Sequence, residues 1–306
     1  MDCDGTPFSL SSLFECAISV LNTASVPTKA TLTHKFAAHW SKGDLPLWSR
    51  RIDDVDTVGC TTLVPDHPAR SVPTSSMPPP MRREGSKKVV KFIHGLCHAE
   101  GVAIDLMWDL IARSILLWGR SIVGSLDDAK KGRELDHHRM DLGEFPREFY
   151  DDWVGIADEE ARHFESWAER FEQVSGGAKY GCFQMHDGLW NSAVETSSDI
   201  LARLAIVHGV HEARGLDVFP KAEVRFLESC DPVSVDLLRR NLKDEIRHVG
   251  TAIRWLTFLC ESRGLDPVTT FHRLVRQHFH GPLPGPFNAE ARTLAGMTPE
   301  WYQPLA

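Results

Sequence analysis

The sequence lacks cysteine pairs of the Cys-x-x-Cys type, although it contains seven cysteines. These cysteines are scattered along the chain and odd in number. A disulfide framework or a zinc ribbon requires regularly spaced pairs, so both classes are excluded. A reducing compartment is therefore expected, and we predict a cytoplasmic protein.

The sequence also lacks a long hydrophobic run. No apolar segment approaches the roughly 20 residues that a helix needs to cross a bilayer. The first residues, Met1-Asp2-Cys3-Asp4, are acidic, whereas a secretory signal begins with basic residues. We expect no membrane partner.

Clustered positive charge is scarce. The net charge is −8, and the basic clusters are short, as at Arg82-Arg83. A long nucleic-acid track requires a clustered positive surface, so the balance argues against one, although a small basic loop leaves tRNA open as a partner. Glycine-rich nucleotide-binding motifs and the Gly-x-Ser-x-Gly motif of serine hydrolases are missing as well.

Composition divides the chain into three parts. Residues 1–85 combine a helical segment with a proline-rich strap, which we expect to pack on the rest. Residues 86–262 show a succession of helical apolar patterns, with almost no strand-like alternation. Residues 263–306 predict a helix that opens at Asp266-Pro267 and an extended tail from Gly281.

The middle part contains four one-sided apolar stripes at three- and four-residue spacing, as bundle helices require. They run about 93–111, 149–174, 194–215 and 238–259, and the third is expected to end at Gly215. The predicted fold is all-α, a four-helix bundle with additional N- and C-terminal helices.

Acidic residues and histidines interrupt every stripe on its apolar face. The interrupting residues are Glu100, Glu160, His163, Glu212, Glu245 and His248. Four buried carboxylates would repel one another, and each costs several kcal/mol, on the order of a lost ion pair. Two metal ions supply the compensating charge, and oxygen plus imidazole donors suit iron or manganese. The alternative is that these are solvated surface acids.

The spacing sharpens this interpretation. Glu160-Ala161-Arg162-His163 and Glu245-Ile246-Arg247-His248 are both Glu-x-x-His, which places two ligands on one helix face. Ferritin-like di-metal carboxylate proteins take one Glu ligand from each of two helices and a Glu-x-x-His pair from each of two others. We therefore predict a ferritin-like bundle.

Three further residues have open roles. His208 lies one helical turn before Glu212, where it is a seventh ligand, a donor to Glu212 or a satisfied core histidine. His186 and Asp187 form a catalytic dyad, or Asp187 is the N-cap of the third helical segment.

Several segments resemble an uncharacterised ferritin-like family called domain of unknown function 455. The resemblance covers residues 90–306 and is carried by residues 146–153, 157–164, 186–190, 211–217, 244–249, 286–292 and 301–302. The chain departs from the family at Gly101 and Val102, next to Glu100. The family is distantly similar to the di-iron tRNA hydroxylase, which implies oxygen chemistry without naming a substrate.

We therefore expect an enzyme, a di-iron monooxygenase or oxidase that uses O2 and an external electron donor on a small organic substrate. Glu160 and Glu245 are expected to bridge two iron ions (manganese is the alternative), with His163 and His248 as nitrogen ligands and Glu100 and Glu212 as terminal acids. A monomer or dimer is expected. The alternatives are a ferroxidase or iron-binding protein, and a metal-bound sensor or interaction protein without turnover.

Overall fold

The computed structural model describes residues 12–48, 64–72, 74–75, 87–130, 145–280 and 283–306. These residues form a helical bundle, which confirms the all-α prediction. The strands in this part of the chain are two short parallel segments, β1 (Thr74–Ser75) and β2 (Met185–His186). None of the helices described here combines the length and apolarity that a bilayer crossing requires.

The chain forms two compact units. The first contains residues 1–70 and 107–158, and the second contains residues 71–106 and 159–306. Two long helices, α3 (Lys87–Lys130) and α5 (Arg147–Ser175), contribute residues to both units. The three-part division made from composition stays a prediction.

The first unit contains the predicted N-terminal helices, α1 (Leu13–Leu21) and α2 (Val26–Ser41). Serine side chains cap the amino ends of both helices and accept a hydrogen bond from a backbone N–H in the first turn. Trp108 of α3 packs edge-on against Phe36, and its indole N–H donates to Thr33 Oγ1 at 2.9 Å. The apolar stripe of α2 is therefore buried against α3, as its spacing indicates.

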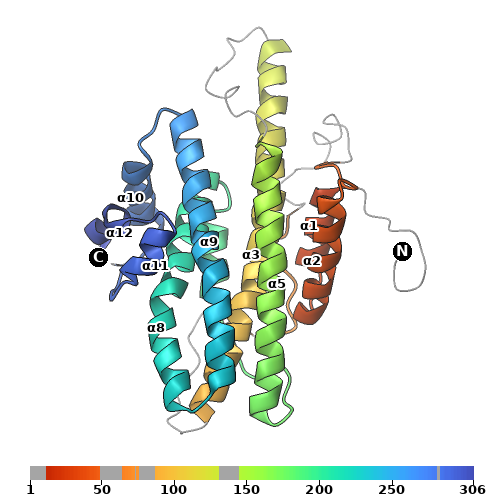
Figure 1. The fold of residues 1–306 in the computed structure, drawn as a ribbon. Helices are drawn as coiled ribbons and strands as arrows, with labels where there is room; N and C mark the ends of the chain where they lie inside the picture. The colour runs from red at the N-terminus through yellow and green to blue at the C-terminus, as the bar shows by residue number, and fades with distance from the viewer. Residues whose placement is uncertain (1–11, 49–63, 73, 76–86, 131–144, 281–282) are drawn as a thin grey trace, which may run out of the picture. The chain divides into compact units, whose positions relative to one another are not determined.

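The second unit contains the parts of α3 and α5 that carry the candidate ligands, together with the remaining helices. These are α6 (Gly188–Glu195), α7 (Ile200–Arg203), the π-helix η3 (Leu204–His211), α8 (Glu212–Glu228), α9 (Pro232–Ser262), α10 (Pro267–His278), α11 (Ala289–Leu294), α12 (Pro299–Tyr302) and the 3-10 turn η4 (Gln303–Leu305). Within this unit, segments of α3, α5, α8 and α9 lie side by side (Figure 1).

Aromatic side chains join three of these four segments. Phe226 of α8 packs on Phe92 of α3 at 5.6 Å between ring centroids and stacks on Trp167 of α5 at 5.9 Å. Helix α8 also packs against α9. These contacts join helices that also carry the acids and histidines of the predicted site.

The predicted end of the third helix at Gly215 is wrong, because α8 continues through Gly215 and Pro220 to Glu228. Proline has no N–H to donate to the carbonyl four residues earlier. The side chain of Asn288 replaces that bond and donates to Leu216 O at 3.2 Å. A contact with the C-terminal segment therefore makes a continuous helix possible here.

The C-terminal part confirms one expectation and corrects another. Helix α10 begins at Pro267, and Asp266 accepts a hydrogen bond from Thr269 N as its N-cap. The tail was expected to be extended, but its described residues include α11, α12 and η4. Asn288 caps α11, and Arg292 of the same helix pairs with Asp217 of α8 at 2.6 Å, so local capping and an ion pair order this segment.

Candidate metal centre

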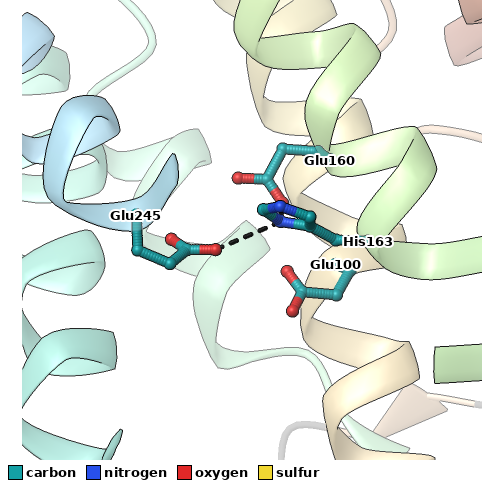
Figure 2. Close-up of side chains that lie close together, drawn as sticks. All are labelled: Glu100, Glu160, His163 and Glu245. Carbon is teal, nitrogen blue, oxygen red and sulfur yellow. Dashed lines mark ion pairs between the residues drawn. The ribbon is translucent and has the colours of Figure 1, made fainter. Parts of the chain in front are cut away.

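The structure brings all six predicted ligand residues together in the second unit. They come from four helices, with Glu100 on α3, Glu160 and His163 on α5, Glu212 on α8, and Glu245 and His248 on α9. Figure 2 shows four of these side chains, Glu100, Glu160, His163 and Glu245, turned toward one another. The apolar stripes and the two Glu-x-x-His motifs therefore pointed to residues that lie together.

The six residues form two overlapping groups, each with four ligand atoms within 4.8 Å of one another. One group contains Glu100 and His163, and the other contains Glu212 and His248. Both groups include Glu160 and Glu245. Two shared carboxylates between two positions are what a pair of bridged metal ions requires.

The inner nitrogens of the two histidines face the shared carboxylates. His163 Nδ1 lies 3.2 Å from Glu245 Oε1, and His248 Nδ1 lies 3.0 Å from Glu160 Oε1. The geometry is not that of a hydrogen bond, and both nitrogens, like Glu160 Oε2, are buried without a hydrogen-bond partner. A buried polar atom in this state is costly unless a cation satisfies it.

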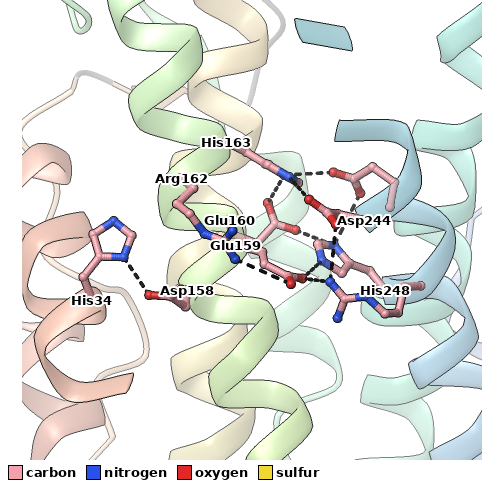
Figure 3. A network of polar contacts seen from close by, with 10 residues as sticks. His34, Asp158, Glu159, Glu160, Arg162, His163, Asp244 and His248 are labelled. Carbon is pink, nitrogen blue, oxygen red and sulfur yellow. Dashed lines mark hydrogen bonds and ion pairs between the residues drawn. The ribbon is translucent and has the colours of Figure 1, made fainter. Parts of the chain in front are cut away.

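The outer nitrogens are held by two other acids in a crossed arrangement (Figure 3). His163 Nε2 of α5 contacts Asp244 Oδ2 of α9 at 3.1 Å, and His248 Nε2 of α9 contacts Glu159 Oε2 of α5 at 2.9 Å. An ionised carboxylate only accepts hydrogen bonds, so each Nε2 carries the proton. In a neutral ring the lone pair is then on Nδ1, pointing at the cluster, as in metal-binding histidines oriented by carboxylates.

Two arginines contact the acids that hold the histidines. Arg247 contacts Glu159 and also lies 3.4 Å from Asp244, and Arg162 lies 3.5 Å from Glu159. Burial would raise the pKa of Glu159, but contacts with His248 and Arg247 lower it below its usual value. Glu159 is therefore held ionised and keeps His248 in one orientation.

Without a cation, protons must balance the charge of the cluster. Burial, assisted by the charges of Glu160 and Glu245, raises the pKa of both Glu100 and Glu212 well above the usual range. Burial also opposes ionisation of Glu160, but contacts with His163 and His248 lower its pKa. Burial would lower the pKa of His163, yet the neighbouring carboxylates raise it to about 11.

Two divalent cations would balance the charge of the cluster in place of protons. Four ionised carboxylates and two neutral imidazoles carry four negative charges, which two divalent cations neutralise. Carboxylate oxygens and imidazole nitrogens are a donor set that fits a pair of metal ions.

The other candidate residues lie outside the two groups. His208 is fully buried in η3, where burial and the charge of Arg203 lower its pKa well below the usual value. Asp187 stands at the N-cap of α6 without a side-chain capping bond. His186 Nδ1 accepts a hydrogen bond from Gly188 N at 2.9 Å, which gives this ring a local structural contact.

Sequence reasoning missed Glu159 and Asp244 and also the π-helix η3. A signal for the two acids was present, because each Glu-x-x-His motif is preceded directly by another acid, in Glu159-Glu160 and Asp244-Glu245. No comparable signal in the sequence predicted η3. This π-helix changes the spacing between His208 and Glu212 from the α-helical spacing that we assumed. π-Helical segments occur frequently at functional sites.

A cavity of about 260 Å³ adjoins the cluster. Its lining includes the carboxylate residues Glu100, Glu212 and Glu245, and the rest of the lining is mainly aliphatic and aromatic. A small molecule in this cavity would lie beside the candidate ligands.

Comparison with known proteins finds a family whose description states no activity. A protein of Haemophilus influenzae (strain ATCC 51907 / DSM 11121 / KW20 / Rd), described as "Uncharacterized protein", is 34% identical over 206 residues. The match covers 67% of this chain and 64% of that protein, less than two thirds of the relative's length. No solved structure matches the chain. The family described as "Protein of unknown function (DUF455)" matches residues 22–303, and the chain belongs to this family.

Proposed function

We propose that this chain is a di-iron carboxylate oxidoreductase with a ferritin-like bundle, which uses O2 to hydroxylate or oxidise an organic substrate. One observation carries the proposal: two groups of ligand atoms share Glu160 and Glu245, and two imidazole nitrogens face them without hydrogen-bond partners. Carboxylate and imidazole donors suit iron, with manganese as the alternative.

The residues divide by their place in the two groups. Glu160 and Glu245, which belong to both, would contact both ions. Glu100 and His163 would complete one position, and Glu212 and His248 the other. Asp244 and Glu159 act as positioning residues, because each holds the outer nitrogen of one histidine and leaves its Nδ1 directed inward.

When bound, a ferrous pair supplies the two electrons needed for reductive activation of O2, and an external donor must replace them. The four carboxylates hold the negative charge that keeps such a pair in place. The largely apolar cavity next to Glu100, Glu212 and Glu245 limits the water that reaches them. This cavity supports an organic substrate over iron storage, which needs a path for ferric ions.

The proposal is tested first by metal content and absorption spectrum on protein from iron-supplemented cells. We expect about two irons per chain, as a bridged site requires, with absorption bands that bleach on reduction and return with O2. No metal above trace after anaerobic ferrous reconstitution would show that the cluster is a protonated polar core.

A matched pair of variants on α5 links the metal to the cluster. Glu160→Ala removes a carboxylate common to both groups, so metal should be lost from both positions. Glu169→Ala removes an exposed acid of the same helix and should leave the metal content unchanged. Full metal content and activity in Glu160→Ala would sink the proposal.

A further inference from the structure

The cavity beside the cluster is lined by three carboxylates and mainly by apolar side chains. Its apolar lining comes from six helical segments and includes Leu96, Trp167, Leu189, Val207, Phe219 and Leu238. Val218 of α8 belongs to the lining and is 47% exposed, which marks the side where the cavity meets solvent. A molecule that enters there would bind with its inner end near Glu100, Glu212 and Glu245.

No lysine or arginine lines this cavity, as far as the described residues extend. In the metal-free chain, a phosphate or carboxylate buried here would have no basic partner and would face three acids, so the cavity disfavours anionic groups. Nucleotides and other phosphate-bearing molecules therefore do not fit inside it.

The neutral polar groups of the lining are already engaged. With its amide oriented to satisfy both atoms, Asn241 accepts from Trp167 Nε1 at 3.1 Å and donates to Leu237 O at 3.2 Å. His211 Nε2 contacts Ser192 Oγ at 2.9 Å, so this ring also has a partner outside the cavity. The lining thus recognises shape and apolar surface more than hydrogen-bonding groups.

The volume sets the size of the occupant. A cavity of about 150 Å³ lined by aliphatic and aromatic residues binds benzene, a molecule of six carbons. By the same ratio, the 260 Å³ cavity has room for about ten non-hydrogen atoms.

We propose that the substrate class of this site is a neutral, apolar small molecule of about ten non-hydrogen atoms, bound in this cavity against Glu100, Glu212 and Glu245. This inference rests on the proposed function, because only that activity makes the bound molecule a substrate. The binding itself depends only on the cavity.

The test is calorimetric titration of the full chain with primary alcohols from butanol to dodecanol, without reductant, both as purified and after metal removal. Affinity should rise about fourfold per methylene, the factor expected for burying a CH₂, and then level off near octanol or nonanol. Octanoate, equal in length to octanol but charged, should bind at least about tenfold more weakly. No saturable binding of any alcohol, or tighter binding of octanoate, would overturn the proposal.

Two variants place the binding in this cavity. Ala222→Phe fills it and should abolish octanol binding, whereas Val224→Phe, at a 52% exposed position of the same helix that does not line the cavity, should leave binding unchanged. Leu238→Ala enlarges the cavity and should move the length limit to longer alcohols. If Ala222→Phe fails to fold, Leu238→Ala decides, and an unchanged length limit there contradicts the proposal.

The two hypotheses fail in different ways. A chain that binds about two irons but no alcohol keeps its metal centre and loses this substrate class. A chain that binds octanol as described but no metal keeps the apolar cavity and loses the proposed oxidoreductase.

Discussion

The Glu-x-x-His segments of α5 and α9 match in sequence but differ in their surroundings. Glu160 of α5 is 1% exposed, whereas the side chain of Glu245 of α9 is 18% exposed. The acids that hold the histidines differ as well: Glu159, behind His248, is 15% exposed and Asp244, behind His163, is 36% exposed. The half of the cluster at His248 is therefore better shielded from solvent than the half at His163.

The difference teaches that a repeated motif does not make two equal positions. The acid that precedes each Glu-x-x-His motif contacts the histidine of the other helix. The surroundings of each histidine therefore depend on the partner helix. Arg247 reinforces Glu159 at the better shielded position. If the site holds two ions, we expect the position at His163 to be more accessible to solvent and to release its metal more readily.

The largest expected effect tests the part that the two halves share. Glu245→Ala removes a carboxylate of both groups, so we expect loss of metal from both positions, as measured by elemental analysis after ferrous reconstitution. Glu261→Ala, an exposed position on the same helix, is the control. Retention of full metal content in Glu245→Ala would contradict the shared role.

The next prediction separates the halves. Glu100 belongs to one group and Glu212 to the other, so Glu100→Ala and Glu212→Ala should each lose about one of two ions, the number in a bridged pair. Elemental analysis of the two single variants and of the double variant measures this. Loss of both ions in each single variant would show that the positions fill only together.

A smaller effect is expected from the acids behind the histidines. Removing such an outer partner costs about tenfold to hundredfold in metal affinity. Glu159→Gln should fall near the upper end and Asp244→Asn near the lower end, because Glu159 is the less exposed acid. Asp236→Asn, at an exposed site on α9, is the control in a competition titration with a chelator. Equal losses in the two variants would remove the proposed asymmetry.

The smallest effect concerns the helix that leads to Glu212. Asp199 caps α7 and accepts hydrogen bonds from Leu201 N at 2.8 Å and Ala202 N at 3.2 Å. Asp199→Ala should lower the free energy of unfolding by about 1 kcal/mol, the usual cost of losing an N-cap. Thr298→Ala is the matched comparison, because Thr298 stands at the N-cap of the equally short α12 without a side-chain capping bond and should matter less. Denaturant titration measures both, and a larger loss in Thr298→Ala would refute the capping argument.

Local rules predicted much of the fold. Apolar spacing located the helical stripes, and Asp266-Pro267 marked the start of α10. They failed where a distant segment supplies what the local sequence lacks. Pro220 by itself predicts the end of a helix, but the helix continues where Asn288 donates to Leu216 O. The prolines of the tail predict an extended segment, but the ion pair between Arg292 and Asp217 orders it.

The sequence by itself indicated which residues gather, because a 3.6-residue period places Glu100, Glu160, His163, Glu245 and His248 on apolar faces that must be buried. Glu212 joins them although the π-helix η3 before it departs from that period. Tertiary structure alone decided which two carboxylates are shared and which acid holds which histidine. These contacts join residues 81 and 89 positions apart in the chain. Their geometry depends on how α5 packs against α9, and no local periodicity contains that information.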